Sequence, residues 1–435
     1  MTATVPASLA SAPEPVAILR DLAERFGTPA YVYDLAAVRT AVAALHDDLP
    51  VGAELLYSVK ANPHPAVVRE ILSAGLTAEV SSSGELETAL AAGCAPRHAL
   101  YTGPGKTPQE LRIALRAGVR RFSVESAADR DRLDDACADT ATRAEYLVRL
   151  NGPRGSLRGS LRMTGRATAF GTDIAAFDEL ATLFRPGRRT RPIGTHTFSA
   201  TNVDDADALA VELRQSVATS SEATREHGFT PELLDLGGGF AAPLGRPGTL
   251  GRHPRLAAEL AVPLDAHFPG WREGAPRLAF ETGRYLTATA GCLLTTVVDV
   301  KSSGGRVFAV LDAGVNVFGG MSGLGRLMAP SVMPYPVTPP TTDLRAAHAE
   351  VPEQGPVALV GPLCTPLDVL NGAAAMPVPE PGQVLAVPNV GAYGLSASLI
   401  GFLGRPAPVE IVVDGSRIVS ARRLRLTPIE GEFDV

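Results

Sequence analysis

The sequence predicts an α/β fold: a closed (β/α)8 barrel joined to a second, all-β domain. Between residues 55 and 282, eight short apolar segments alternate with segments rich in Ala, Leu and Glu. Such alternation is typical of parallel strands connected by helices, and a barrel of eight such units takes about 250 residues. After Leu286 the pattern changes to short strands bounded by Pro and Gly, which indicates a separate β domain.

The eight predicted barrel strands are apolar runs that end at a polar residue or a glycine. They span residues 55–60, 78–82, 99–103, 121–125, 145–150, 193–198, 233–238 and 278–282. The segments between the first few of these strands, such as 66–74 and 84–92, repeat apolar residues at helical spacing. They end at an Ala-Gly pair, which is typical of a helix C-terminus. The alternative is a doubly wound open sheet, which would carry a GxGxxG turn after its first strand. Lys60-Ala-Asn-Pro stands there instead.

The remaining strands are assigned to the β domain. Residues 297–301 and 306–311 form a predicted hairpin, followed by strands at 357–360, 383–387, 409–413 and 417–425. Residues 30–34 form a strand before the barrel. The predicted organisation is a tail and strand at 1–37 that joins the β domain, a barrel at 38–285, and the β domain at 286–435. Residues 329–356, which contain many Pro and Ala, are expected to form a long loop or surface insertion.

Composition excludes several classes of protein. The chain has 435 residues and a net charge of −6, which gives no case for nucleic-acid or membrane binding. Its four cysteines form no CxxC pair, so neither a disulfide framework nor a metal site is expected, and a reducing, cytoplasmic setting fits. The first fourteen residues lack the basic and apolar regions of a signal peptide, and no apolar run is long enough to span a bilayer.

The unusual residues of the barrel fall at the carboxyl ends of predicted strands, where the active sites of this fold lie. Lys60 follows an apolar run and precedes the break Asn62-Pro63, which places one amine at the mouth of a buried strand. A lysine desolvated by apolar neighbours has a lowered pKa and can form a Schiff base. The whole set consists of Lys60, Ser82, Glu125, Arg149, His196, Gly237, Gly238, Gly239 and Glu281.

Six short motifs follow one another along the chain. They are Tyr57-Ser-Val-Lys60-Ala-Asn62, Gly194-Thr-His196-Thr-Phe-Ser199, Gly237-Gly238-Gly239, Glu281-Thr-Gly283-Arg284, Gly361-Pro-Leu-Cys364 and Gly391-Ala-Tyr393. In this order and spacing the chain resembles the fold-type III pyridoxal-phosphate-dependent decarboxylases, which include diaminopimelate, ornithine and arginine decarboxylases, with alanine racemases as distant kin. The resemblance runs from about Phe26 to Gly394. It implies an alanine-racemase-like architecture, pyridoxal 5′-phosphate as the cofactor, and α-decarboxylation of an amino acid.

The resemblance also implies roles for the residues of these motifs. Lys60 would hold the cofactor aldehyde as an imine, and His196 would stack on the cofactor ring. Glu281 would face the pyridine nitrogen and keep it protonated, which makes the ring a better electron sink. Ser199, the three glycines and Tyr393 would contact the phosphate. The complete predicted cofactor site is Lys60, Ser82, Arg149, His196, Ser199, Gly237, Gly238, Gly239, Glu281, Gly283, Arg284 and Tyr393.

Cys364 would be the acid that reprotonates the substrate carbon after CO₂ leaves, and it completes a catalytic set with Lys60 and His196. In relatives this segment reaches the active site of the other subunit, which implies a homodimer with shared active sites. The predicted substrate contacts are Arg284, Thr365 and Asp368.

Three departures from the family pattern bear on the substrate. Thr365 stands directly after Cys364, where relatives that act on distal amines place an acid, and a neutral hydroxyl cannot form the charge-assisted bond that an ammonium needs. The segment after Asp312-Ala-Gly314 lacks Arg-Pro-x-Leu-Tyr, and Ala169 replaces the usual basic residue before Phe-Gly. The expected substrate is therefore not diaminopimelate, ornithine or lysine. It is a natural-product or siderophore intermediate, or an aminoacyl group tethered to a carrier protein.

Arginine recurs at every fourth position of one further segment, at Arg154, Arg158, Arg162 and Arg166. The Gly and Ser content of this segment favours a loop over a helix. Two interpretations stay open: a solvated charged loop, or a docking strip for an acidic carrier protein or a substrate tail.

Two other functions share parts of this pattern. An amino-acid racemase uses the same cofactor, but alanine racemases place an arginine at the pyridine nitrogen, where this chain has Glu281. A non-catalytic regulator that resembles a decarboxylase would lack cofactor ligands, whereas Lys60, His196, Cys364 and Tyr393 are all present. The sequence therefore favours a pyridoxal-phosphate-dependent carboxy-lyase.

Overall fold

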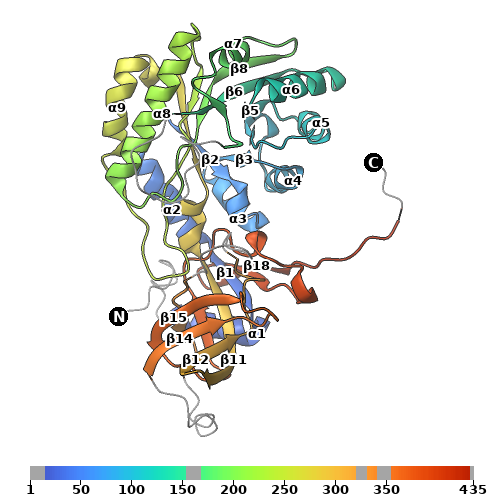
Figure 1. Ribbon diagram of the computed structural model, residues 1–435, viewed down its shortest axis with the longest axis vertical. Coiled ribbons are helices and arrows are strands. Elements are labelled where there is room, and N and C mark those ends of the chain that lie inside the picture. Colours follow the sequence, from blue (N-terminus) through green and yellow to red (C-terminus); the bar gives the residue numbers. More distant parts are fainter. Residues whose placement is uncertain (1–14, 153–167, 320–330, 340–353, 432–435) are drawn as a thin grey trace. The chain divides into compact units, whose positions relative to one another are not determined.

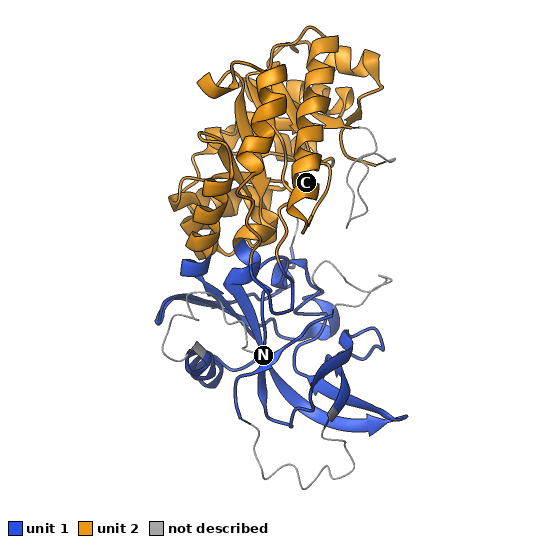
Figure 2. Cartoon of the chain, turned by 90° about the vertical axis from the view of Figure 1, so that its left-hand side faces the viewer, with its two compact units in different colours: residues 1–37, 243–249, 287–435 blue, residues 38–242, 250–286 orange. Residues whose placement is uncertain are grey.

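The computed structural model describes residues 15–152, 168–319, 331–339 and 354–431. The chain divides into two compact units (Figures 1 and 2). Unit 1 comprises Met1–Ala37, Pro243–Thr249 and Thr287–Val435, and unit 2 comprises Val38–Ala242 and Leu250–Leu286. The sequence placed its boundaries after residues 37 and 285, and it did not separate residues 243–249 from the barrel.

Unit 2 contains a closed barrel of eight parallel strands. These are β2 (Glu54–Ser58), β3 (Thr77–Val80), β4 (Leu100–Tyr101), β5 (Arg121–Val124), β6 (Ala144–Asn151), β8 (Thr190–Thr197), β9 (Leu233–Asp235) and β10 (Arg277–Thr282). Each strand pairs in parallel with the next, and β10 pairs with β2 to close the ring. The predicted barrel is confirmed, and each of the eight predicted strands overlaps an observed one. A short strand, β7 (Thr172–Asp173), pairs with the end of β6.

Buried apolar side chains from the barrel strands form one cluster, so the barrel interior is packed. The cluster consists of Leu56, Leu100, Leu147, Ile193, Leu233 and Ala279.

The helices of unit 2 lie around the outside of the barrel (Figure 1). Four of them begin at a side chain that accepts a hydrogen bond from the N–H group three residues later: Ser82, Thr107, Ser126 and Asp205. Gly118 ends α5 with a φ of 100°, which favours glycine. The helices are α2 (Leu35–Asp48), α3 (Pro65–Ser73), α4 (Ser83–Ala91), α5 (Pro108–Ala117), α6 (Ala127–Asp139), α7 (Phe177–Leu183), α8 (Ala206–Glu226), α9 (Leu256–His267) and α10 (Arg284–Thr287).

Short 3-10 turns occur in both units. They are η1 (Val59–Ala61), η2 (Pro96–His98), η3 (Trp271–Glu273), η4 (Ala288–Ala290), η6 (Leu395–Ala397) and η7 (Phe402–Gly404). The first of them, η1, directly follows β2 and contains Lys60.

In its described residues, unit 1 is a sheet of nine strands with one helix, α1 (Pro15–Phe26). Its strands pair in the order β15-β14-β12-β11-β1-β17-β18, and β16 pairs with both β11 and β13. The strands are β1 (Ala30–Asp34), β11 (Gly291–Ser303), β12 (Arg306–Leu311), β13 (Tyr335–Pro336), β14 (Gln354–Val360), β15 (Val369–Pro377), β16 (Val384–Val387), β17 (Val409–Asp414) and β18 (Arg417–Arg423).

Strand β1 lies inside this sheet, antiparallel to β11 and parallel to β17. Leu19 and Leu22 of α1 share a core cluster with Val32, Leu294 and Ile411 of the sheet. The predicted hairpin of β11 and β12 is present, whereas α1, β13 and β15 were not predicted.

Residues 329–356 were expected to form a loop, and the structure corrects part of this expectation. Strand β13 pairs with β16, and β14 begins at Gln354. Residues 329, 330 and 340–353 lie outside the described residues. In the part of the chain that is described, no helix has both the length and the apolar composition that crossing a membrane requires.

Candidate active site

Lys60 lies in the turn after β2, and its amine is held by Glu79 near the end of β3. Lys60 Nζ is 3.1 Å from Oε2 and 3.2 Å from Oε1 of Glu79. The Glu79 side chain is 1% exposed, whereas the Lys60 side chain is 45% exposed. The expectation that apolar neighbours desolvate Lys60 is therefore wrong, because the side chain is partly exposed and the group that holds its amine is a buried carboxylate.

Glu79 is a site residue that the sequence analysis missed. The hydroxyl groups of Ser81 and Thr102 also donate to its Oε1. Burial alone would raise the pKa of Glu79. The charge of Lys60 and hydrogen bonds from Thr102 and Ser58 together outweigh this effect, so the net pKa lies below its ordinary value. The signal in the sequence was a single acid in the strand Thr77–Val80.

Three buried polar side chains meet at the carboxyl ends of β8, β9 and β10. His196 Nε2 is 3.4 Å from Glu281 Oε1, and one ligand atom each of His196, Asp235 and Glu281 lie within 4.8 Å of one another. His196 Nδ1 is 2.8 Å from Ser123 Oγ on β5. In the described residues, His196 Nε2, Asp235 Oδ2 and Glu281 Oε1 make no hydrogen bond. The sequence predicted His196 and Glu281 here but missed Asp235 and Ser123.

Burial and charge set the protonation of this cluster. Burial lowers the pKa of His196 well below its ordinary value, and the positive charges of Arg149, Lys60 and Lys106 lower it further. Burial raises the pKa of Glu281 well above its ordinary value, and the negative charges of Glu79 and Asp235 add to this effect. The imidazole is therefore neutral, and the Glu281 carboxyl group retains a proton to higher pH than an exposed glutamate.

Arg149 of β6 was predicted to contact the cofactor, and the structure pairs it with Glu125. Arg149 Nη1 is 2.8 Å from Glu125 Oε1, and both side chains are buried. The Arg149 guanidinium lies 4.8 Å from the centre of the Phe170 ring. Behind this pair, Asp129 accepts the N–H group of Glu125 and forms a buried ion pair of 2.7 Å with Lys106. A direct contact of Arg149 with the cofactor stays a prediction.

The glycine run follows β9 and allows close approach between neighbouring strands. A Cβ atom at Gly237 would lie 2.2 Å from Thr197 O, and one at Gly238 would lie 2.1 Å from Glu281 O. In the described residues, the N–H groups of Gly238 and Gly239 donate no hydrogen bond, and the same is true of the Ser199 hydroxyl. The glycine run therefore allows both close packing of the strands and binding of an anion.

The other predicted cofactor ligands of unit 2 lie beside these groups in the sequence. Ser82 Oγ caps α4 by accepting the N–H group of Glu85 at 3.2 Å. A Cβ atom at Gly283 would lie 2.8 Å from Ala61 Cβ, so the turn after β10 packs against the turn that carries Lys60. Arg284 is half-buried at the start of α10.

These features fit pyridoxal 5′-phosphate. A neutral imidazole presents a flat face to an aromatic ring, and the proton held near Glu281 can be shared with a ring nitrogen. The backbone amides of Gly238 and Gly239 suit a phosphate, because adjacent N–H groups form anion-binding concavities. Lys60 provides the amine that the cofactor aldehyde requires.

The remaining predicted site residues belong to unit 1. Cys364 is a free, exposed thiol, and Thr365 Oγ1 accepts the N–H group of Leu367 at 3.3 Å. Asp368 is buried, and its two oxygens accept the N–H groups of Val315 and Leu363 at 2.7 and 2.8 Å. Asp368 thus fixes its own loop, and its contact with a substrate stays a prediction.

Tyr393 of unit 1 has a φ of 51°, in the left-handed region that costs a non-glycine residue free energy. Such strain persists only where the surrounding structure enforces it. The arginine segment with Arg154, Arg158, Arg162 and Arg166 lies outside the described residues, so its proposed docking function stays a prediction.

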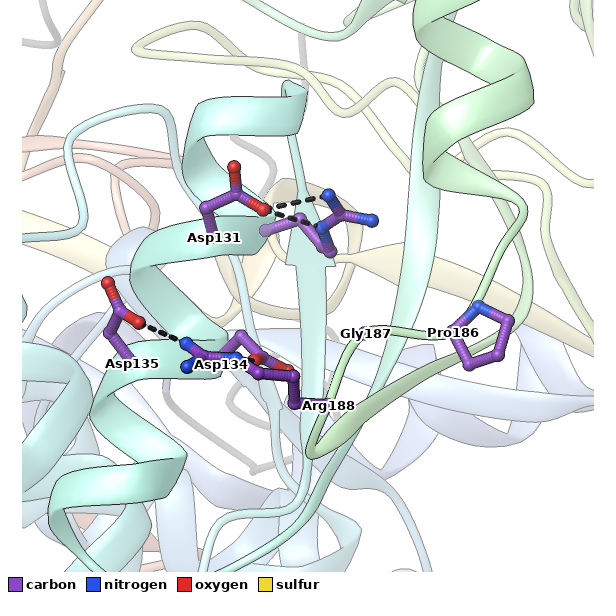
Figure 3. A pocket seen from close by; sticks show the side chains of 7 residues that line it. Asp131, Asp134, Asp135, Pro186, Gly187 and Arg188 are labelled. Carbon is purple, nitrogen blue, oxygen red and sulfur yellow. Dashed lines mark hydrogen bonds and ion pairs between the residues drawn. The ribbon is translucent and has the colours of Figure 1, made fainter.

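A charged hollow of about 620 Å³ lies at the opposite, amino-terminal end of β8 (Figure 3). It is lined by Arg130, Asp131, Asp134, Asp135 and Arg188, together with Pro186 and Gly187. Arg188 pairs with Asp134 at 3.0 Å and with Asp135 at 2.5 Å, and Arg130 pairs with Asp131 at 2.7 Å. Because its charged side chains are paired with one another and it lies at the strand ends opposite those that carry the site, this hollow is no candidate active site.

Comparisons with known proteins identify the family of this chain. The family described as "Pyridoxal-dependent decarboxylase, pyridoxal binding domain" matches residues 35–288. The chain is 30% identical to L-glutamyl-[BtrI acyl-carrier protein] decarboxylase of Niallia circulans over 395 residues, which cover 90% of each protein. It is 34% identical to the diaminopimelate decarboxylase of Actinosynnema pretiosum over 423 residues, covering 93% of this chain and 88% of the relative.

A solved structure shows the same fold. The diaminopimelate decarboxylase of Helicobacter pylori, complexed with L-lysine, matches with a TM-score of 0.78 and 21% identity, covering 93% of this chain and 95% of that one. The family match spans more than half of the chain and includes Lys60, His196, the glycine run and Glu281. The chain therefore belongs to the pyridoxal-dependent decarboxylase family, and it is a carboxy-lyase that uses pyridoxal 5′-phosphate.

Proposed function

We propose that this enzyme removes the α-carboxylate of an aminoacyl group tethered to an acidic carrier protein, with a glutamyl group as the first candidate. The observation that carries the proposal is the 30% identity to L-glutamyl-[BtrI acyl-carrier protein] decarboxylase across 90% of both proteins. Thr365 supports it independently, because a neutral hydroxyl beside Cys364 suits a substrate without a distal ammonium. A glutamyl group has no such ammonium.

Diaminopimelate is the second candidate substrate, since the chain is 34% identical to one diaminopimelate decarboxylase. Its distal end carries an ammonium and a carboxylate, which require charged partners when they are bound away from water. The neutral residues Thr365 and Ala169 do not supply them, so we rank this substrate second.

The residue roles follow from the chemistry. When bound, the cofactor supplies the electron sink that accepts the electron pair of the broken bond between Cα and the carboxylate. We assign Lys60 to holding the cofactor and Glu281 to holding the proton that a ring nitrogen shares. Neutral His196 supports the flat ring, and Ser199, Gly238 and Gly239 bind the phosphate.

The remaining chemistry is one proton transfer. Loss of CO₂ leaves Cα short of one proton, and we assign its delivery to the exposed thiol of Cys364. The proposal includes a cytoplasmic homodimer with shared active sites, in which Cys364 of one subunit serves the site of the other. A reduced, exposed thiol is compatible with a reducing compartment.

The test is CO₂ release from an L-glutamyl group on a carrier protein, compared with free glutamate, ornithine, lysine and meso-diaminopimelate. We expect kcat/KM for the tethered group to exceed that for any free amino acid by at least about 100-fold, because binding of the carrier lowers the barrier. A Lys60→Arg variant serves as the inactive control. If kcat/KM is highest for diaminopimelate, the second candidate replaces the first.

A further inference from the structure

Unit 1 carries a groove on one face of its sheet. It has a volume of about 660 Å³ and is formed by β11, β12, β14 and β15 with the loop at 361–368. Its apolar floor includes Phe308, Val310, Ala358, Val360 and Val369. Val310 pairs with Val360 and Phe308 with Ala358 across the parallel strands β12 and β14, so these side chains lie side by side.

The floor is the second face of a sheet whose first face is already buried. Along β12, Val307, Ala309 and Leu311 are buried, whereas Phe308 and Val310 between them are only half-buried. Alternate residues of a strand point to opposite faces. In the described residues, the groove therefore leaves two large apolar side chains of β12 partly in contact with solvent.

One end of the groove is cationic. Lys301 and Arg306 lie where β11 turns into β12, and both are exposed. Arg306 Nη2 donates to Gly372 O at 2.9 Å, and its guanidinium lies 5.3 Å from the centre of the Phe308 ring. The acid that lines the groove, Asp368, is buried and accepts two backbone N–H groups. The exposed charges among the lining residues are therefore positive.

The other end of the groove is the loop that carries the predicted proton donor. Thr365 and Pro366 line it, and Cys364 immediately precedes them. Strands β12 and β14 are parallel, so their carboxyl ends both point toward this loop and their amino ends toward Arg306. The six residues of β12 span roughly 20 Å. The groove thus joins a cationic end to the loop of Cys364 over an extended apolar floor.

We propose that this groove binds the phosphate-bearing arm of the carrier protein, an extended chain of amides and methylene groups that ends in the acyl thioester. The inference rests on the proposed function. Arg306 and Lys301 bind the phosphate, which a guanidinium recognises through two parallel hydrogen bonds. The floor at Phe308 and Val310 takes the methylene groups, and the aminoacyl end extends along the loop of Cys364 and Thr365.

A second copy of this chain is the competing occupant. It would have to cover the apolar floor and also supply an anionic partner for Lys301 and Arg306. A phosphate joined to an apolar arm meets both requirements in one ligand, and this charge complementarity decides between the two.

Calorimetric titration of the holoenzyme with 4′-phosphopantetheine and with pantetheine tests the groove directly. We expect the phosphorylated compound to bind at least about tenfold more tightly, as charge-assisted hydrogen bonds contribute this much. The double variant Lys301→Glu, Arg306→Glu should lose this preference. The matched control Arg417→Glu, Arg423→Glu on β18 makes the same change of charge outside the groove and should keep it. Equal binding of both compounds, or a preference that survives in the groove variant, overturns the proposal.

Kinetics separate this inference from the proposed function. With the carrier-bound substrate, the groove variant should raise KM about tenfold at unchanged kcat, and it should process a small soluble thioester of the same aminoacyl group as the wild type does. If the wild type binds the arm but never decarboxylates the tethered group, the proposed function fails and the groove stands. If the wild type decarboxylates the tethered group and the groove variant does so with the same KM, the proposed function stands and the groove proposal fails. If light scattering shows that the variant changes the oligomeric state, the groove is an interface between copies.

Discussion

His196, Asp235 and Glu281 show how a barrel interior controls protons at the level of single residues. All three are buried, and their polar atoms face one another within 4.8 Å. Burial disfavours every charged form, so it lowers the pKa of His196 and raises the pKa values of Asp235 and Glu281. The negative charge of Glu79 raises both acid pKa values further. The cluster therefore retains protons on oxygen rather than on nitrogen.

Glu281→Gln should change the pH dependence of stability in the cofactor-free protein. The pKa of Glu281 is raised in the folded protein, so this carboxyl group contributes to the free energy of unfolding. The contribution is complete below the pKa of the unfolded chain, about 4.3, and is lost as pH rises from there through the pKa of the folded protein. The glutamine does not titrate and escapes this loss. The melting temperature of the variant, relative to the wild type, should therefore rise between pH 5 and pH 8 in thermal unfolding scans.

Asp265→Asn provides the control for this measurement. Hydrogen bonds from Arg272 and Trp271 lower the pKa of Asp265, so its contribution to stability is present above the unfolded value of about 3.9 and is lost only as pH falls. The difference between this variant and the wild type should stay constant from pH 5 to pH 8. A constant difference for Glu281→Gln as well would contradict the raised pKa of Glu281.

At the residue level, sequence motifs identified the groups that we assign to the cofactor more readily than the groups that support them. Lys60, His196 and Glu281 belong to motifs whose order is specific. Glu79 and Ser123 do not, because a single acid or serine inside a strand has no distinctive spacing. Their importance depends on which neighbour the closed barrel brings to them: Lys60 lies 19 positions from Glu79 and His196 lies 73 from Ser123.

At the level of elements, the N-caps of α4 and α5 give a matched pair of helix starts. Ser82 and Thr107 each accept the N–H group of a glutamate three residues later, at 3.2 Å. Replacing either by alanine should cost about 1 kcal/mol of stability. Ser82 is also a predicted cofactor ligand, and Thr107 is not.

Ser82→Ala should therefore differ from Thr107→Ala in cofactor binding and not in stability. Both variants should lower the melting temperature of the cofactor-free protein by similar amounts. Only Ser82→Ala should raise the Kd for pyridoxal 5′-phosphate, by about tenfold, as expected for a lost hydrogen bond to a charged group. Spectrophotometric titration measures both values, and identical Kd values for the two variants would leave Ser82 with its capping function alone.

The barrel strands were predictable because each is a short apolar run with a clear end, and helices with polar and glycine boundaries separate them. Strand β15 was missed because Val369–Pro377 contains Gly, Asn and three consecutive alanines, which are poor indicators of a strand. It forms because β14 offers it an edge to pair with. Helix α1 was missed although Ile18, Leu19 and Leu22 have helical spacing, because it follows directly on a segment interpreted as a tail.

For the whole molecule, the proposed homodimer with shared active sites predicts recovery of activity when inactive variants are mixed. Lys60→Ala and Cys364→Ala should each be nearly inactive alone. After subunit exchange, half of the dimers are mixed and each mixed dimer has one intact site, so activity should return to about a quarter of the wild-type value. Turnover of the best substrate in the mixture measures this recovery.

The matched control mixes Lys60→Ala with His196→Ala. Both changes lie in unit 2, so no mixed dimer contains an intact barrel site, and activity should not return. If the mixture of Lys60→Ala with Cys364→Ala also stays inactive although mass spectrometry detects mixed dimers, Cys364 does not act across the subunits.

The position of β1 between β11 and β17 has a consequence for synthesis on the ribosome. Ala30 of β1 pairs with Val409 of β17, so β17 is translated long after the strand with which it pairs. At about 5–20 residues per second, β1 waits roughly 20–75 s for β17 to emerge. All five residues of β1 are buried in the finished sheet. Meanwhile the barrel strands emerge one after another, so the nascent chain can complete its catalytic barrel while its first strand still offers chaperones an uncovered apolar segment.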